Sequence, residues 1–376
     1  MALSLKAGRI LGIPIYLHVT LLLILPLFAF TFAYSEATLL GFDLGYGRLE
    51  VDDAVKIALG TLMAVLLFLS ILAHELAHSI VALRHGYTVS GITLYIFGGA
   101  SQLEKVPEHA PKEARMAAVG PLTSLVIGLA FVPLYLVTKP LGDAVWMETL
   151  AVTFSAMAFY NLLLGGFNLI PAFPMDGGRV LRAALAERMG FLRATQYAAD
   201  VGKAIALLMG IFGFFFNIWL ILIAFFIYFG ATEELEMTKV TEALRGVKVR
   251  EVMTKEVSTV SPDLYLDELQ GRILAERHMG YPVLENGIPV GMVTLEDLAR
   301  VPESRKPLTQ VKEVMSRDLN SVPPGMEAME ALQILSGKKI GRLVVVEEGK
   351  IVGIISRTDL VQAVNMMAQA KGALRV

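Results

Sequence analysis

The sequence predicts a polytopic α-helical membrane domain of about six transmembrane helices, followed by a soluble α+β domain made of two repeats. Three observations predict this fold class. The chain of 376 residues is 55% hydrophobic and only 18% charged, which is too apolar for a soluble protein of this length. Its apolar stretches all lie in residues 1–236, whereas residues 239–376 are rich in charged side chains. Within the second part, residues 249–262 and 311–324 are similar to each other, which indicates an internal repeat.

Six segments are long and apolar enough to cross a bilayer, which takes about 20 residues of helix. The last two meet in a tight turn at Asn217. The first is expected to remain in the protein as a span, because no small-residue cleavage site follows a short apolar core. The predicted spans are residues 14–34, 54–83, 116–138, 147–168, 198–216 and 218–236.

Charged residues flanking the spans predict their orientation. Basic residues gather on one side, beginning with Lys6 and Arg9, while the segment between the first two spans is acidic, with Asp43, Glu50 and Asp53. Basic flanks face the cytoplasm in multi-pass proteins. We therefore expect a multi-pass protein of the cell membrane with both termini and the repeat domain in the cytoplasm.

The segment between the second and third spans is expected to form a hairpin. Residues 88–103 are rich in β-branched and aromatic side chains and are interrupted by Gly98 and Gly99, a pattern that favours strands over a helix. Two placements remain open. The hairpin either enters the membrane, where protein or water must cover its backbone, or lies outside it as a cytoplasmic loop.

Two histidines near the end of the second span are candidate metal ligands. His74 and His78 are four residues apart, so a helix presents both from one face, and Glu75 lies next to them. A lone histidine on an apolar face is more often a packed core residue. An ionisable cluster inside a membrane span is costly, however, and is functional by default. The motif lies in the last third of a span that runs toward the cytoplasm, so water can reach it from that side.

Asp176 is the candidate third ligand. A catalytic zinc ion takes three protein ligands and keeps one open position, and a chain without cysteine must supply them from histidine or carboxylate. Asp176 follows Pro171 and Pro174, which break the helix, and precedes Gly177 and Gly178, which permit a tight turn back toward the metal. The alternative is that Asp176 is only the N-cap of the next helix.

Together these motifs resemble the site-2 protease family of intramembrane zinc metalloproteases. The resemblance implies that His74, His78 and Asp176 bind one zinc ion, that Glu75 is the catalytic acid and base, and that Asn168 engages the substrate or the developing oxyanion. It also implies single-span membrane proteins in the lipid bilayer as substrates, cleaved within their transmembrane segments. The matching stretches are "GRILGIPIYLHVT" at 8–20, "HELAH" at 74–78, "AVGPLTS" at 118–124 and "NLIPAFPMDGG" at 168–178.

The second part of the chain resembles a tandem cystathionine-beta-synthase (CBS) pair. The similar stretches at 249–262 and 311–324 are offset by 62 residues, and "GMVTLEDL" at 291–298 matches "GIISRTDL" at 353–360 at the same offset. Each copy is expected to run as strand, helix, two strands and helix, with the two copies packed as a pseudo-twofold pair. The predicted division is a protease domain at 1–236, a linker at 237–246, and CBS repeats at 247–303 and 304–376.

The CBS resemblance implies binding of adenine nucleotide, with Thr294, Asp297, Ser356 and Asp359 contacting ribose. The same residues are also common helix N-caps, so a structural role, or a homodimer formed through the pair, is the alternative. A formal net charge of −2 argues against a general nucleic-acid-binding protein.

The sequence therefore predicts an intramembrane zinc endopeptidase that is modulated by adenine nucleotide. The alternative is a CBS-regulated membrane transporter or channel. A transporter should show repeated halves and polar groups spread along a pathway. Here the ionisable residues converge on one site near the cytoplasmic side, which favours the enzyme. An inactive scaffold is disfavoured, because no expected site residue is missing.

Overall fold

The computed structural model describes residues 4–95, 98–103, 110–141 and 144–373. The chain divides into two compact units, Met1–Glu236 and Met237–Val376, which are described separately. The first unit contains β1 (Ser4–Ile10), β2 (Ile13–His18), α1 (Val19–Tyr34), β3 (Thr38–Leu39), β4 (Phe42–Asp43), α2 (Asp53–Arg84), β5 (Val89–Tyr95), β6 (Gly98–Leu103), α3 (Ala110–Thr138), the 3-10 turn η1 (Lys139–Leu141), α4 (Val145–Asn168), α5 (Asp176–Met189), α6 (Phe191–Phe216) and most of α7 (Ile218–Leu244).

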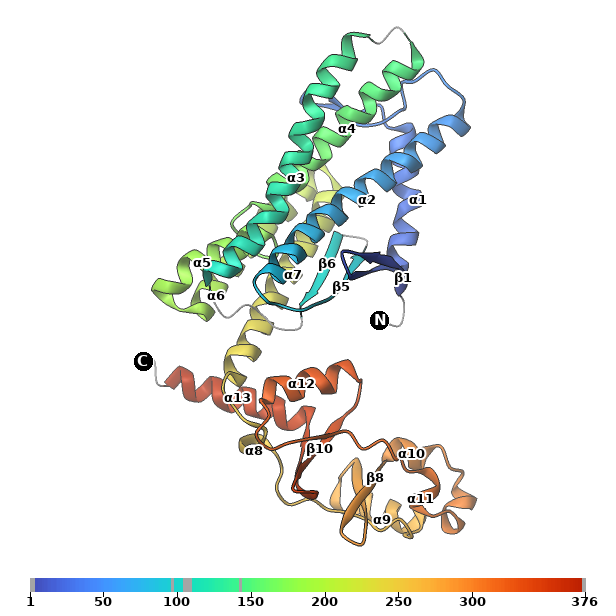
Figure 1. Ribbon diagram of the computed structural model, residues 1–376, viewed down its shortest axis with the longest axis vertical. Coiled ribbons are helices and arrows are strands. Elements are labelled where there is room, and N and C mark those ends of the chain that lie inside the picture. Colours follow the sequence, from blue (N-terminus) through green and yellow to red (C-terminus); the bar gives the residue numbers. More distant parts are fainter. Residues whose placement is uncertain (1–3, 96–97, 104–109, 142–143, 374–376) are drawn as a thin grey trace. The chain divides into compact units, whose positions relative to one another are not determined.

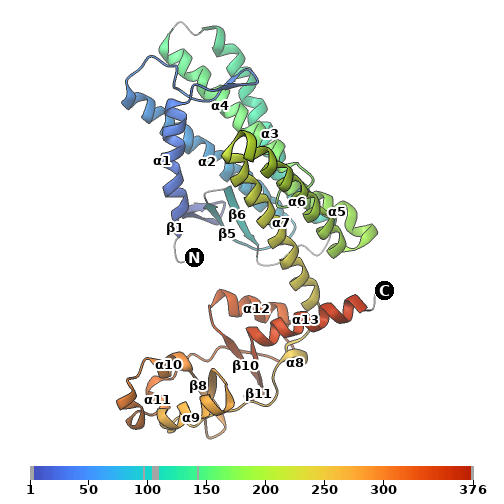
Figure 2. The same cartoon turned by 180° about the vertical axis from the view of Figure 1, so that it is seen from behind.

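Five helices of the described chain are long and apolar enough to cross a membrane: α2, α3 with η1, α4, α6 and α7. This agrees with the polytopic α-helical domain that the sequence predicts. Helices α2, α3 and α4 lie side by side (Figure 1), and α6 and α7 are in front when the molecule is seen from behind (Figure 2). The turn predicted between α6 and α7 is present, and the Asn217 side-chain oxygen accepts a hydrogen bond from the Trp219 amide at 2.9 Å.

The first predicted span differs from its expected bounds. Helix α1 has 16 residues and begins at Val19, because Ile13–His18 form strand β2 instead. Ile13 and Ile15 are buried on one face of this strand, as the two-residue period of a strand requires. At 1.5 Å per residue α1 is about 24 Å long, shorter than the other apolar helices.

The strands of the first unit form a four-stranded sheet in the order β1-β2-β5-β6. The predicted 88–103 hairpin is confirmed as the antiparallel pair β5–β6. Strand β2 joins β5 in parallel and β1 in antiparallel pairing. Ile92 and Leu94 of β5 pack with Leu72 of α2 in one buried cluster, so the sheet rests on the helix that carries the histidine motif.

The second unit contains the two predicted α+β repeats. In chain order its elements are α8 (Val249–Val252), α9 (Leu266–Glu276), β7 (Gly280–Glu285), β8 (Ile288–Thr294), α10 (Leu295–Ala299), η2 (Glu303–Leu308), α11 (Val311–Val314), β9 (Ser321–Val322), α12 (Ala328–Gly337), β10 (Arg342–Glu347), β11 (Lys350–Ser356) and α13 (Arg357–Ala373). The strand expected at the start of each repeat is present as β9 in the second. In the first repeat it is reduced to a single bridge between Val260 and Val283.

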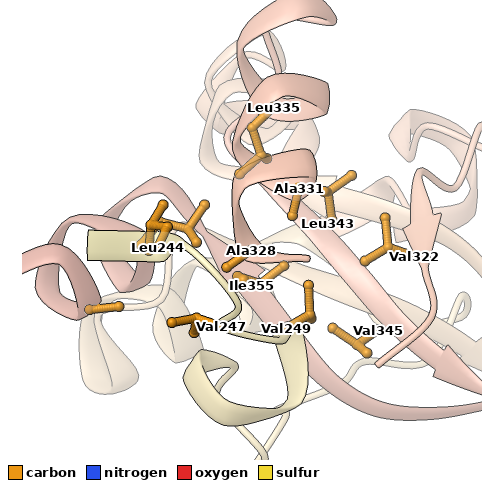
Figure 3. Packing of buried hydrophobic residues seen from close by; sticks show 12 residues of the cluster. Leu244, Val247, Val249, Val322, Ala328, Ala331, Leu335, Leu343, Val345 and Ile355 are labelled. Carbon is orange, nitrogen blue, oxygen red and sulfur yellow. The ribbon is translucent and has the colours of Figure 1, made fainter. Parts of the chain in front are cut away.

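The two repeats exchange their first segments. Val249 of α8 packs into the core formed by Leu343 and Ile355 of the second repeat (Figure 3). Val311 of α11 packs into the core of the first repeat, against residues such as Val283. This exchange relates the repeats as the pseudo-twofold pair that the sequence predicts.

Isolated bridges follow the same symmetry. Thr254 pairs with Ile354 and Met292 pairs with Ser316, so adding the 62-residue offset to one member of each bridge gives a member of the other. Leu244, the last residue of α7, is fully buried in the core of the second repeat (Figure 3).

Candidate metal centre

Helix α2 presents both histidines of the predicted motif from one face. His74 is buried and His78 is half-buried. Their ring centroids are 4.8 Å apart and their planes meet at 77°. The helix runs without interruption from Asp53 to Arg84, so its 3.6-residue period is enough to bring the two rings together.

Asp176 reaches the same point from a distant part of the chain. It is the first residue of α5, whose N-cap is Met175, so the carboxylate is not used as the N-cap. Its Oδ2 atom lies 3.1 Å from the Nε2 atoms of both His74 and His78. Among the residues that the structure describes, these three form the group suited to hold a metal ion.

The turn before Asp176 depends on the two glycines that follow it. A Cβ atom on Gly177 would lie 2.3 Å from the Ile170 carbonyl oxygen, and one on Gly178 would lie 2.6 Å from the carbonyl carbon of Ala172. Neither position has room for a side chain. The tight turn predicted from the sequence therefore requires glycine because of close backbone contact.

The three candidate ligand atoms form a triangle that fits zinc. The Nε2 atoms of His74 and His78 are also 3.1 Å apart, so all three edges of the triangle are 3.1 Å. Tetrahedral zinc with bonds of about 2.0–2.1 Å needs ligand atoms roughly 3.3 Å apart. The triangle matches one face of such a tetrahedron, slightly compressed, and a zinc ion held there would keep its fourth position for water or substrate.

The other ring nitrogens have partners that orient the ligands. The Nδ1–H of His78 donates to the carbonyl oxygen of Met116 at 2.6 Å, and Nδ1 of His74 lies 2.9 Å from the Ser124 hydroxyl. With Nδ1 as the donor, each Nε2 turns an unprotonated lone pair toward Asp176. Three acceptor atoms that face one another repel unless a cation lies between them, so the donor set suits a metal ion.

Gly120 of α3 lies against the rings of both histidines, where no side chain would fit. A Cβ atom at this position would lie 2.2 Å from Nε2 of His78 and 2.8 Å from Nε2 of His74. Gly120, Ser124 and Met116 were not predicted as site residues from the sequence. A glycine followed by proline inside an apolar span was the available signal, since such a pair marks a break or a close approach.

Glu75 lies against the edge strand of the sheet. A Cβ atom on Gly99 would approach Cγ of Glu75 to 2.3 Å, so the β6 backbone passes directly over this side chain. Glu75 is half-buried, one residue after the ligand His74. The predicted base and the predicted hairpin therefore meet at one place.

Asn168 is the last residue of α4 and is half-buried. Its amide donates to the Leu164 carbonyl at 3.0 Å within the same helix. The described contacts do not join Asn168 to the histidines or to Asp176.

The four predicted ribose contacts lie at two equivalent helix starts. The Thr294 hydroxyl donates to Asp297 at 2.7 Å, and the Ser356 hydroxyl donates to Asp359 at 2.6 Å. Both pairs thus form N-terminal caps, for α10 and for α13. The second pair has a contact across the repeats, because the Thr254 hydroxyl lies 3.5 Å from the other oxygen of Asp359.

Comparisons with known proteins agree with the predictions for both the membrane part and the CBS part of the chain. The model of Peptidase family M50 matches residues 62–142 and 133–209, and the CBS domain model matches residues 249–304 and 311–365. The chain is 34% identical to zinc metalloprotease MJ0392 of Methanocaldococcus jannaschii, over 98% of each chain. It is 33% identical to the putative zinc metalloprotease Rip3 of Mycobacterium tuberculosis, over 98% of this chain and 94% of that protein.

A solved structure, the site-2 protease from Methanocaldococcus jannaschii, is 36% identical and covers 62% of this chain and 95% of its own, with a TM-score of 0.43. Both of these relatives match nearly the whole chain and are named as zinc metalloproteases, Rip3 as a putative one, so the transporter alternative is not favoured. The chain belongs to the site-2 protease family, as an intramembrane zinc metalloprotease with a C-terminal tandem CBS pair.

Proposed function

We propose that His74, His78 and Asp176 hold one zinc ion per chain and that Glu75 is the acid and base of peptide-bond hydrolysis. The observation that supports this proposal is the triangle of ligand atoms with 3.1 Å edges, against which Gly120 packs closely. The substrates in this proposal are single-span membrane proteins that are cut within the membrane.

The chemistry follows from the donor set. A zinc ion held by these three residues would lower the pKa of bound water toward neutrality and would polarise a peptide carbonyl. Glu75 takes the proton from the attacking water and returns it to the leaving amine. Asn168, at the end of α4, is assigned to the substrate or to the developing oxyanion.

Strand β6 is the proposed docking edge for the substrate. A transmembrane helix hides its peptide bonds, so it must unwind locally before it is cut. Strand β6 lies at the edge of the sheet and passes over Glu75, so an unwound segment paired with it would lie beside the base.

The proposed topology places both termini and the CBS pair in the cytoplasm, with the site opening toward that side. The proposed division is a protease domain over residues 1–236, a linker at 237–246, and CBS repeats at 247–303 and 304–376. Cysteine substitutions at the predicted loops, tested with a membrane-impermeant thiol reagent, measure this orientation. Labelling of the CBS pair from outside intact cells would overturn it.

Proteolysis is tested with purified full-length protein and a panel of single-span membrane proteins. Cleavage should stop with a chelator and return with added zinc, and a Glu75→Gln variant should be inactive in the same assay. Cleavage that survives complete removal of the metal would contradict the proposed site.

A second proposal concerns the CBS pair, which we infer binds adenine nucleotide through Thr294, Asp297, Ser356 and Asp359. The supporting observation is that both Ser/Thr–Asp pairs occupy symmetry-related positions, with Thr254 of the first repeat close to Asp359 of the second. A fragment used to test binding must begin before Leu244, because that residue is buried in the core.

Calorimetry with ATP, ADP and AMP should show heat of binding, and nucleotide should alter cleavage by the full-length enzyme. A ligand can do so only by binding two arrangements of the enzyme with different affinity. No heat at millimolar concentration would leave the CBS pair as a dimerisation element, which the mass of the purified protein in detergent would reveal.

A further inference from the structure

A buried ionic cluster lies close to the candidate zinc site and takes no part in the chemistry proposed above. Arg182 of α5 donates through Nη1 to Glu234 of α7 at 2.9 Å, and through Nη2 to Glu113 of α3. The side chains of Arg182 and Glu113 are only 4% and 5% exposed. One guanidinium therefore joins three helices of the first unit inside its packed interior.

The same guanidinium also contacts the turn that leads into Asp176. The Arg182 guanidinium carbon lies 4.9 Å from the ring centroid of Phe173 and 4.6 Å from that of Phe191. Phe173 is fully buried three residues before the ligand, and its amide donates to the Ala198 carbonyl at 3.2 Å. Arg182 thus packs against the segment whose course sets the position of the Asp176 carboxylate.

Helix α3 connects this cluster with the two histidine ligands. Glu113, Met116, Gly120 and Ser124 are separated by three, four and four residues, so they form a stripe along one face of the helix. The last three contact or make room for the histidines. Glu113 instead binds Arg182 on the helix of the third ligand. One face of α3 therefore contacts both ligand-bearing helices.

Net stabilisation is a poor explanation for the cluster. Removing charges from water often offsets their attraction, so buried ion pairs contribute little to stability unless every polar atom is satisfied. The second carboxylate oxygen of Glu113 is buried without a hydrogen-bond partner among the described residues. The planar guanidinium, however, fixes the direction of each partner, which suits a role in alignment.

We propose that Arg182 is a positioning residue for the zinc site. By binding Glu113 and Glu234 and stacking on Phe173, it holds the first turn of α5 so that Asp176 completes the ligand triangle. This inference rests on the ligand set proposed above. It assigns a role to a residue that touches neither metal nor substrate.

The test compares Arg182→Met with Arg188→Met in the purified full-length enzyme. Arg188 is an exposed arginine on the same helix, so it is a matched control. The readouts are the zinc dissociation constant, the visible spectrum of the cobalt-substituted protein, and kcat and KM. In Arg182→Met we expect zinc affinity to fall about 10–100-fold, as is usual for residues that orient metal ligands. The tetrahedral cobalt bands should weaken, and kcat should fall more than KM rises.

Wild-type zinc affinity and cobalt spectrum in folded Arg182→Met would overturn the proposal, because a purely structural ion pair would leave both unchanged. If Arg182→Met does not fold, the triple variant Arg182→Met, Glu113→Gln, Glu234→Gln removes the unpaired buried charges. We expect the triple variant to fold and still to bind zinc weakly, and wild-type affinity in it would also overturn the proposal. Failure of the ligand set itself is seen separately, as undiminished zinc binding in Asp176→Ala.

Discussion

Replacing Gly120 with alanine adds one methyl group against the two histidines of the candidate zinc site. The new carbon would lie 2.2 Å from Nε2 of His78, 2.5 Å from Cε1 of the same ring and 2.8 Å from Nε2 of His74. The first distance is shorter than an ordinary contact between non-bonded atoms by at least about 1 Å. Either the His78 ring rotates away or α3 moves back, and in both cases the ligand triangle opens.

We expect a large loss of zinc affinity and little change in the stability of α3. Loss of a residue that only orients a ligand weakens metal binding 10–100-fold. Displacing a ligand should therefore weaken zinc binding by at least about 100-fold, which is about 2.8 kcal/mol. Alanine is a better helix former than glycine by about 1 kcal/mol, so α3 itself should not be weakened.

The assay measures zinc per chain and the zinc dissociation constant by competition with a coloured chelator, together with proteolysis. Gly210→Ala is the control, because a methyl group there would meet only Ala224 at an ordinary 3.8 Å. The reasoning is refuted if Gly120→Ala keeps one tightly bound zinc per chain and full activity.

Three further substitutions test the roles proposed for Glu75, for Asp176 and for the aspartates of the CBS pair. Glu75→Gln should keep zinc and lose about 10²–10⁴-fold in cleavage rate, because it removes the proton acceptor and no ligand; full activity would remove Glu75 from the mechanism. Asp176→Ala should lose zinc as well as activity, because two imidazoles lack the third anchor; one zinc per chain in the variant would point to another ligand. Asp297→Ala with Asp359→Ala should abolish the nucleotide response in calorimetry and cleavage assays and keep basal proteolysis, while loss of the carboxylate half of each cap lowers stability by up to about 1 kcal/mol each. An unchanged nucleotide response would place the ligand elsewhere.

Features that depend only on residues close together in the sequence were predictable. His74 and His78 meet because a helix repeats every 3.6 residues, and no other part of the chain is needed to bring the rings to one face. Long apolar runs predict the membrane helices, and a repeat at constant offset predicts the CBS pair. Gly177 and Gly178 predicted a tight turn at Asp176, and the turn is present.

Other features depended on how the helices pack. Strand β2 replaces the beginning of the first predicted span, and its residues 15–17 pair with β5, a partner more than 70 residues away. The exchange of α8 and α11 between the CBS cores is likewise invisible to a repeat alignment, which records similarity and not which core a segment enters.

The candidate zinc site contains features of both kinds, some predictable from local sequence and some dependent on packing. The histidine pair and the acidic residue beside it were predictable from the sequence, because their geometry is that of one helix. Asp176 was predicted as the third ligand, but its 3.1 Å distance from His74, 102 residues earlier, depends on how the helices pack, as does the position of Gly120 against the histidine rings. The contact between Arg182 and Glu113 on α3 likewise depends on this packing. Such contacts depend on the rotation and separation of packed helices, and these are set by many weak side-chain contacts spread over the whole bundle rather than by any local pattern.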